Sequence, residues 1–175
     1  MKSKYNIIIA CDPDVKKSGV FTLYPHDKTY VEQSLLFPHL LTYLQAMNEA
    51  AIRFNNSAVC VVEAGWLNQS HWHIPRTGSM ANVKKAAQIG NATGRNHEVG
   101  RKIVEWCEYI NLDIVEQKPY MKCWKGQDKK ITHEEINEIL GNLGMKQMKS
   151  SNQEVRDAAL ISLLYHNLPI RVSAK

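Results

Sequence analysis

Three apolar segments in this chain border on acidic residues. Two are strand-like runs, one ending in Asp12 and the other in Glu63. The third is a helix-like run whose first turn carries Glu154 and Asp157. A carboxylate at the rim of an apolar core is costly unless another group compensates its charge. We therefore expect a fold in which these four acids lie at the edge of the core, close to a compensating charge.

The apolar pattern predicts five strands and four helices. Three strands follow one another, with a turn at residues 25–28, which implies an antiparallel meander. Later strands alternate with helices, and helical crossovers favour parallel strands. In chain order we expect strands at 4–12, 19–24 and 29–36, a helix ended by residues 55–57, a strand at 58–63, a loop at 65–78, an interrupted helix at 79–110, a strand at 112–116, and helices near 133–141 and 154–166.

This order predicts an α/β fold with a five-stranded mixed sheet flanked by helices. Ligands in such sheets bind beyond the carboxyl ends of parallel strands. If the first and fourth strands are neighbours, Asp12 and Glu63 lie side by side at such an end. Glu154 and Asp157 are three residues apart and share one face of the last helix. A cluster of four carboxylates would suit Mg²⁺, which prefers oxygen ligands.

Composition narrows the class of protein. With 175 residues, of which 44% are hydrophobic, one domain covering residues 1–175 is the expectation. The four cysteines form no CxxC pair, which argues against a zinc knuckle or a disulfide framework. The start of the chain lacks a signal-peptide core, and no apolar run reaches membrane length. We expect a reduced, cytoplasmic setting and no membrane partner.

The positive charge of the chain is concentrated in residues 76–130. This segment carries eleven lysines and arginines against six acids, so its excess equals the net charge of +5 of the whole chain. A nucleic acid is the obvious partner, although a solvated basic helix face would give the same composition. Trp72, in the loop predicted at 65–78, could stack on a DNA base or pack in the core. The candidate DNA contacts are Trp72, Arg76, Lys84, Lys85, Arg95 and Lys118.

Four motifs, in order along nearly the full length, resemble those of the RuvC-type Holliday junction resolvases of the RNase H-like superfamily. The first is an Asp-Pro turn leading to a strand that opens with glycine, and the last is a pair of acids three apart before small apolar residues. The matching segments are 9–13 with Ser18 and Gly19, 61–63, 87–94, and 154–159.

The resemblance implies a bacterial or phage-encoded homodimer that cuts four-way DNA junctions with Mg²⁺ or Mn²⁺, using two ions. Carried over by position, the metal ligands and catalytic acids would be Asp12, Glu63, Glu154 and Asp157. Lysines after the fifth strand also serve catalysis in this family. The nearest lysines in this chain are Lys122 and Lys125. Other expectations are a related nuclease acting on flaps or hybrids, and a catalytically silent DNA-binding protein.

Several of these residues also have structural interpretations. Asp12 could form an Asx turn, and Glu154 could complete a capping box with Ser151. Asp14 stands where the family places glycine, so it would either alter the turn or add a carboxylate near the metal. His71 and His73 could be metal ligands or simply polar surface residues. Gly90 and Gly94 could allow close helix packing or mark the interruption of the helix.

Overall fold

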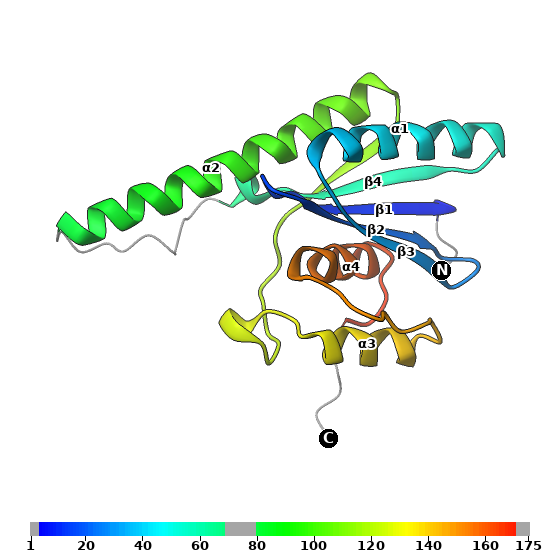
Figure 1. Cartoon of the computed structure of the whole chain (residues 1–175). Helices are drawn as coiled ribbons and strands as arrows, with labels where there is room; N and C mark the ends of the chain where they lie inside the picture. Colours follow the sequence, from blue (N-terminus) through cyan, green and yellow to red (C-terminus); the bar gives the residue numbers. More distant parts are fainter. Residues whose placement is uncertain (1–3, 69–79, 171–175) are drawn as a thin grey trace.

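The computed structural model describes residues 4–68 and 80–170. Its centre is a five-stranded sheet with the order β3-β2-β1-β4-β5 (Figure 1). The antiparallel part of the sheet consists of β1 (Ile7–Asp12), β2 (Ser18–Tyr24) and β3 (Thr29–Leu35). On the other side, β1 pairs in parallel with β4 (Ala58–Glu63), and β4 pairs in parallel with β5 (Asp113–Gln117). The predicted mixed sheet is confirmed.

Helices cover both faces of this sheet (Figure 1). One face carries α1 (Phe37–Arg53) and α2 (Met80–Tyr109). The other face carries α4 (Gln153–Tyr165), against which α3 (His133–Asn142) packs. No helix in the described part of the chain is long and apolar enough to span a membrane.

Burial on both faces explains why β1 is an uninterrupted apolar run. Side chains alternate along a strand, so Ile8 and Ala10 enter the core beneath α4. Ile7, Ile9 and Cys11 enter the core beneath α1 and α2. A strand covered on both sides has no solvent-facing positions for polar residues, except at its ends. Asp12 occupies such an end.

The predicted interruption of the long helix is wrong. The 30 residues of α2 are continuous through Gly90 and Gly94, because an isolated helical glycine costs only about 1 kcal/mol relative to alanine. Both glycines are exposed, and a Cβ atom on either would meet nothing within 4 Å. They do not serve close packing against the sheet. That Gly90 and Gly94 pack against another subunit stays a prediction.

The two predicted capping boxes have different outcomes. Thr132 and Glu135 form the reciprocal capping box at the start of α3, as predicted. At the start of α4 the N-cap is Asn152, whose side chain accepts a hydrogen bond from the backbone N–H of Val155 at 2.9 Å. The box with Ser151 is therefore wrong, because asparagine caps a helix as well as serine does. Glu154 therefore does not have the capping role expected for it.

The first turn of α4 lies directly against β2 at Gly19. A Cβ atom on Gly19 would overlap the backbone carbonyl of Glu154. Gly19 pairs with Asp12 in the β1–β2 register. The missing side chain therefore allows α4 to approach the sheet beside the carboxyl end of β1.

We expect Gly19→Ala to lower the free energy of unfolding by about 1–3 kcal/mol, the usual range for overpacking. The obstructing atoms are backbone, so α4 must shift to relieve the overlap. Gly90→Ala is the matched control, and it should raise the free energy of unfolding by about 0.5–1 kcal/mol because its site is open. Urea denaturation measures both changes. A Gly19→Ala protein as stable as the parent would contradict the close contact.

Candidate active site

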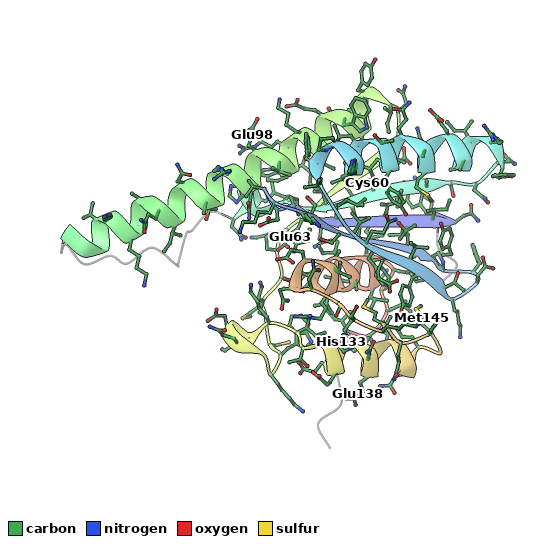
Figure 2. All side chains as sticks on the ribbon, viewed as in Figure 1. Cys60, Glu63, Glu98, His133, Glu138 and Met145 are labelled. Carbon is green, nitrogen blue, oxygen red and sulfur yellow. The ribbon has the colours of Figure 1, made fainter. Side chains whose placement is uncertain are left out.

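Asp12 and Glu63 are the last residues of two adjacent parallel strands. In the β1–β4 register Cys11 pairs with Val62, so the two acids that follow lie side by side. Both strand ends lie at the same edge of the sheet, where Figure 2 labels Glu63. The third acid, Asp157, lies on α4, which packs against β1 and β2. Three chain segments that are distant in sequence thus bring carboxylates to one edge.

Burial raises the pKa of all three carboxyl groups, and neighbouring negative charge raises the pKa values of Asp12 and Glu63 further. The pKa of Asp12 is raised well above its ordinary value, first by burial and then by the negative charges of Glu63 and Asp157. Burial likewise raises the pKa of Glu63, and the charge of Asp157 adds to that effect. The pKa of Asp157 is raised by burial as well. Ionising all three groups at this edge is therefore costly unless a cation lies beside them.

Glu154 is less closely coupled to these three carboxyl groups. It is partly buried in the first turn of α4, where its backbone carbonyl faces Gly19. It is not among the principal charges that raise the pKa of Asp12 or Glu63. Within the described residues, its carboxylate forms no ion pair or hydrogen bond. The structure thus brings three of the four predicted acids together.

The three carboxylates suit a divalent cation in chemistry, although they do not form a closed cage. Among the described residues, no three acidic, histidine or cysteine side chains are close enough together to hold a metal ion. Their pKa values are nevertheless raised, first by burial, so the ionised carboxylates at this edge need a cation beside them. Oxygen donors with uncompensated charge are the ligands that Mg²⁺ and Mn²⁺ take. The residues present therefore fit such an ion in the chemistry of their donor atoms.

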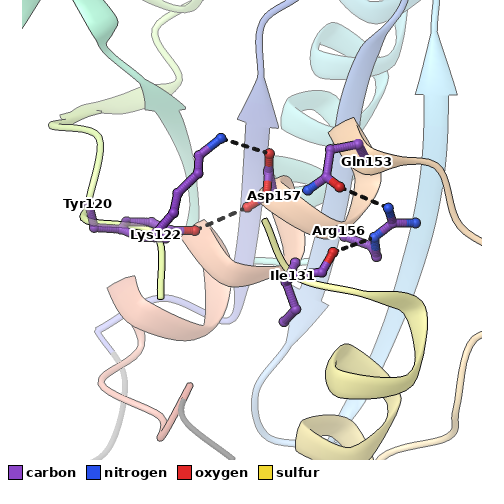
Figure 3. Close-up of polar contacts among 6 residues, drawn as sticks. All are labelled: Tyr120, Lys122, Ile131, Gln153, Arg156 and Asp157. Carbon is purple, nitrogen blue, oxygen red and sulfur yellow. Dashed lines mark hydrogen bonds and ion pairs between the residues drawn. The ribbon is translucent and has the colours of Figure 1, made fainter. Parts of the chain in front are cut away.

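Lysines from the segment after β5 supply part of the missing charge. Lys122 Nζ lies 3.7 Å from Asp157 Oδ2 (Figure 3). Lys130 lies near enough to lower the pKa values of Glu63 and Asp157. Lys125 is exposed, and its backbone N–H donates to both carboxylate oxygens of Glu135 at 3.2 Å. Of the two predicted lysines, only Lys122 is placed at the cluster, and sequence reasoning missed Lys130.

Two further residues beside Asp157 were not predicted. The Gln153 side-chain amide donates to Asp157 Oδ1 at 2.8 Å. The Tyr120 hydroxyl donates to the backbone carbonyl of Asp157 at 3.4 Å (Figure 3). Burial raises the pKa of Tyr120 well above its ordinary value, and the charges of Glu63 and Asp157 raise it further. In the sequence, only the spacing of Gln153 four residues before Asp157 could have indicated a contact.

On the side facing α2, Asp12 and Glu63 line a cavity of about 190 Å³. Trp66 forms part of its wall, and its ring Nε1–H donates to Glu116 Oε2 at 2.7 Å. The Arg101 guanidinium lies 5.5 Å from the centre of the same ring. Gly100 makes room for the ring, because a Cβ atom there would lie 2.5 Å from it. The lining residues are Asp12, Pro13, Glu63, Gly65, Trp66, Thr93, Asn96 and His97.

Asp14 serves the turn between β1 and β2. Its Oδ1 atom accepts a hydrogen bond from the backbone N–H of Lys16 at 2.7 Å, which forms an Asx-type turn. Its Oδ2 atom accepts a hydrogen bond from Asn96 of α2 at 3.4 Å. Both oxygens therefore have structural partners in the turn and in α2.

The predicted DNA contacts lie on α2 and beyond β5. Lys84, Lys85 and Arg95 are exposed on α2, and Lys118 is exposed just after β5. The first half of α2 projects past the sheet, on the side where Glu63 lies (Figures 1 and 2). Lys84 and Arg95 line an open hollow of about 510 Å³ along this helix. The remaining candidates, Trp72 and Arg76, lie outside the described residues, as do His71 and His73.

No protein-family model and no curated protein sequence match this chain. Among solved structures, Thermus thermophilus RuvC in complex with Holliday junction substrate aligns with a TM-score of 0.50 at 12% identity, over 91% of this chain and 92% of that chain. A second Thermus thermophilus RuvC structure has a TM-score of 0.47 at 13% identity, over 91% and 93%. The Fowlpox virus resolvase in complex with Holliday junction DNA has a TM-score of 0.43 at 12% identity, over 92% and 97%. The chain has the RNase H-like fold of RuvC.

Proposed function

We propose that this chain is a metal-dependent endonuclease that resolves four-way DNA junctions, with one nuclease domain spanning residues 1–175. The observation that carries the proposal is the meeting of Asp12, Glu63 and Asp157 at one edge of the sheet, beside Lys122. The fold shared with RuvC, whose structure is solved with a Holliday junction substrate, supports the choice of DNA substrate.

The proposed reaction is hydrolysis of a phosphodiester bond. Asp12, Glu63 and Asp157 would hold Mg²⁺ or Mn²⁺, with Glu154 completing a site for two ions. When bound, such ions activate a water molecule and stabilise the leaving 3′ oxygen. All three carboxyl groups would hold the ion in their ionised form. Lys122 then presents a compact positive charge to the scissile phosphate.

Branched DNA and a second copy of the chain are the proposed partners. Resolution requires two strands to be cut, and a symmetric homodimer would supply two equivalent sites. The exposed Lys84 and Lys85 in the projecting first half of α2, with the exposed Arg95 further along the helix, are suited to contact phosphates beside the cut. Lys118 would add to this surface from the end of β5.

We expect paired cuts in a synthetic four-way junction in the presence of Mg²⁺ or Mn²⁺, and no cuts in EDTA. Gel analysis should compare the junction with a flap, an RNA–DNA hybrid and a linear duplex. Asp12→Asn and Asp157→Asn should each abolish cutting, because each removes a charged ligand. Equal cutting of linear duplex would eliminate junction resolution, preference for flaps or hybrids would favour a related nuclease, and binding without cutting would indicate a silent protein.

Without metal, Asp12→Asn should raise the melting temperature at pH 7.5 by about 2–4 °C, equivalent to roughly 1 kcal/mol for a domain of this size. A carboxyl group whose pKa is raised on folding stabilises the protein below its unfolded pKa, and this contribution is lost as the pH rises through the folded value. The advantage of the asparagine variant should therefore shrink as the pH is lowered towards 4.

The same melting curves recorded with Mn²⁺ provide the control for this prediction. Mn²⁺ should raise the melting temperature of the parent protein, because it binds the folded state only. It should have much less effect on Asp12→Asn. A parent protein that is more stable than the variant in EDTA at every pH would show that the charge on Asp12 is already compensated.

Lys122→Met should lower the rate of junction cleavage about 10²-fold, the usual effect of removing one positioned electrostatic group. Lys125→Met should leave the rate close to that of the parent, since Lys125 is exposed and contacts Glu135 through its backbone. Single-turnover cleavage with saturating protein separates this effect from DNA binding. Equal losses in both variants would assign the lysines to general DNA attraction.

A further inference from the structure

The two carboxylate oxygens of Asp157 have different partners. Oδ1 accepts a hydrogen bond from the Gln153 side-chain amide at 2.8 Å. Oδ2 faces Lys122 Nζ at 3.7 Å, beyond hydrogen-bonding distance (Figure 3). The side chain of Asp157 is 13% exposed, so these neighbours largely determine its orientation. Gln153 is the only one of the two that is within hydrogen-bonding distance.

The orientation of Gln153 is determined in turn by Arg156. The Gln153 Oε1 atom accepts a hydrogen bond from Arg156 Nη2 at 2.8 Å. A guanidinium group has donors only, so it must face the oxygen of an amide and never its NH₂ group. The Gln153 NH₂ group is consequently directed at Asp157. The same side chain without Arg156 could present either end to the carboxylate.

Arg156 is itself fixed by three further hydrogen bonds. Its Nε–H donates to the backbone carbonyl of Ile131 at 3.0 Å. Its Nη1 group donates to the Ser151 backbone carbonyl at 2.7 Å and to the Ser151 hydroxyl at 3.4 Å. Ile131 directly follows Lys130, one of the two lysines near the acids. Arg156 thus connects the first turn of α4 to the end of the lysine-bearing segment (Figure 3).

We propose that Gln153 and Arg156 are positioning residues that orient Asp157 for metal binding, with Oδ1 held by Gln153 and Oδ2 left for the ion. Neither residue touches the reacting atoms. Gln153 acts through Asp157, and Arg156 acts through Gln153 and through the backbone beside Lys130. This inference rests on the proposed metal-dependent function of the site. Partners that orient the ligands of a metal typically contribute about 10–100-fold to its affinity.

The test is a Mn²⁺ titration of the melting temperature in the absence of DNA. Gln153→Leu keeps the approximate size of the side chain and removes its hydrogen bonds. We expect it to raise the Mn²⁺ concentration that gives half of the full stabilisation by about tenfold or more. Its melting temperature in EDTA should stay within a few degrees of the parent value. Arg156→Lys keeps the charge but not the fork of donors, so it should produce a shift in the same direction.

Gln45→Leu is the matched control. Gln45 donates to Glu49 at 3.0 Å with the same four-residue spacing, on the exposed side of α1 and away from the acids. It should leave the Mn²⁺ titration unchanged. If Asp157→Asn loses the response to Mn²⁺ while Gln153→Leu keeps the parent midpoint, the positioning role is overturned and the proposed function stands. If the parent protein itself does not respond to Mn²⁺, both are overturned.

Discussion

The parallel pairing of β1 with β4 is the constraint on which the site depends. It places the last residues of two buried strands next to each other, at a point where neither can move away from the core. When both residues are acidic, the pairing forces like charges together in a partly desolvated place. α4 adds Asp157 to the same edge; burial raises the pKa values of all three groups, and the charge of Asp157 raises those of Asp12 and Glu63 further. Strand pairing contributes favourably to folding elsewhere and offsets this local repulsion.

Residues whose positions follow from periodicity could be predicted from the sequence. Alternating burial along β1 and β4 locates the strand ends, so Asp12 and Glu63 were predicted as neighbours and are neighbours in the structure. The position of Asp157 could be predicted in a similar way, from the face of the last helix on which it lies. Glu154 shares that face by spacing alone, yet it is not among the main charges acting on Asp12. The N-cap of α4 is Asn152 and not Ser151, and this shift of one residue removes the capping role expected for Glu154.

Residues on irregular segments could not be predicted in this way. Lys130 and Tyr120 lie between β5 and α3, where no repeating pattern relates sequence distance to position in space. The path of that segment is set by specific hydrogen bonds, such as those from Arg156 to Ile131 and from Lys125 to Glu135. Lys122, which faces Asp157, was predicted, but Lys125 was predicted in the place that Lys130 takes in the structure. Choosing between them requires the folded backbone.

Because of the contact at Gly19, the two faces of the sheet tolerate changes in core side chains to different extents. On the α4 face, main chain meets main chain at Gly19, so no change of side-chain volume can adjust the separation of helix and strand at that point. On the α1 and α2 face, side chains fill the space, and larger or smaller ones can be exchanged in compensating pairs. Sequence drift within the core should therefore alter the second layer of helices while the acids keep their spacing.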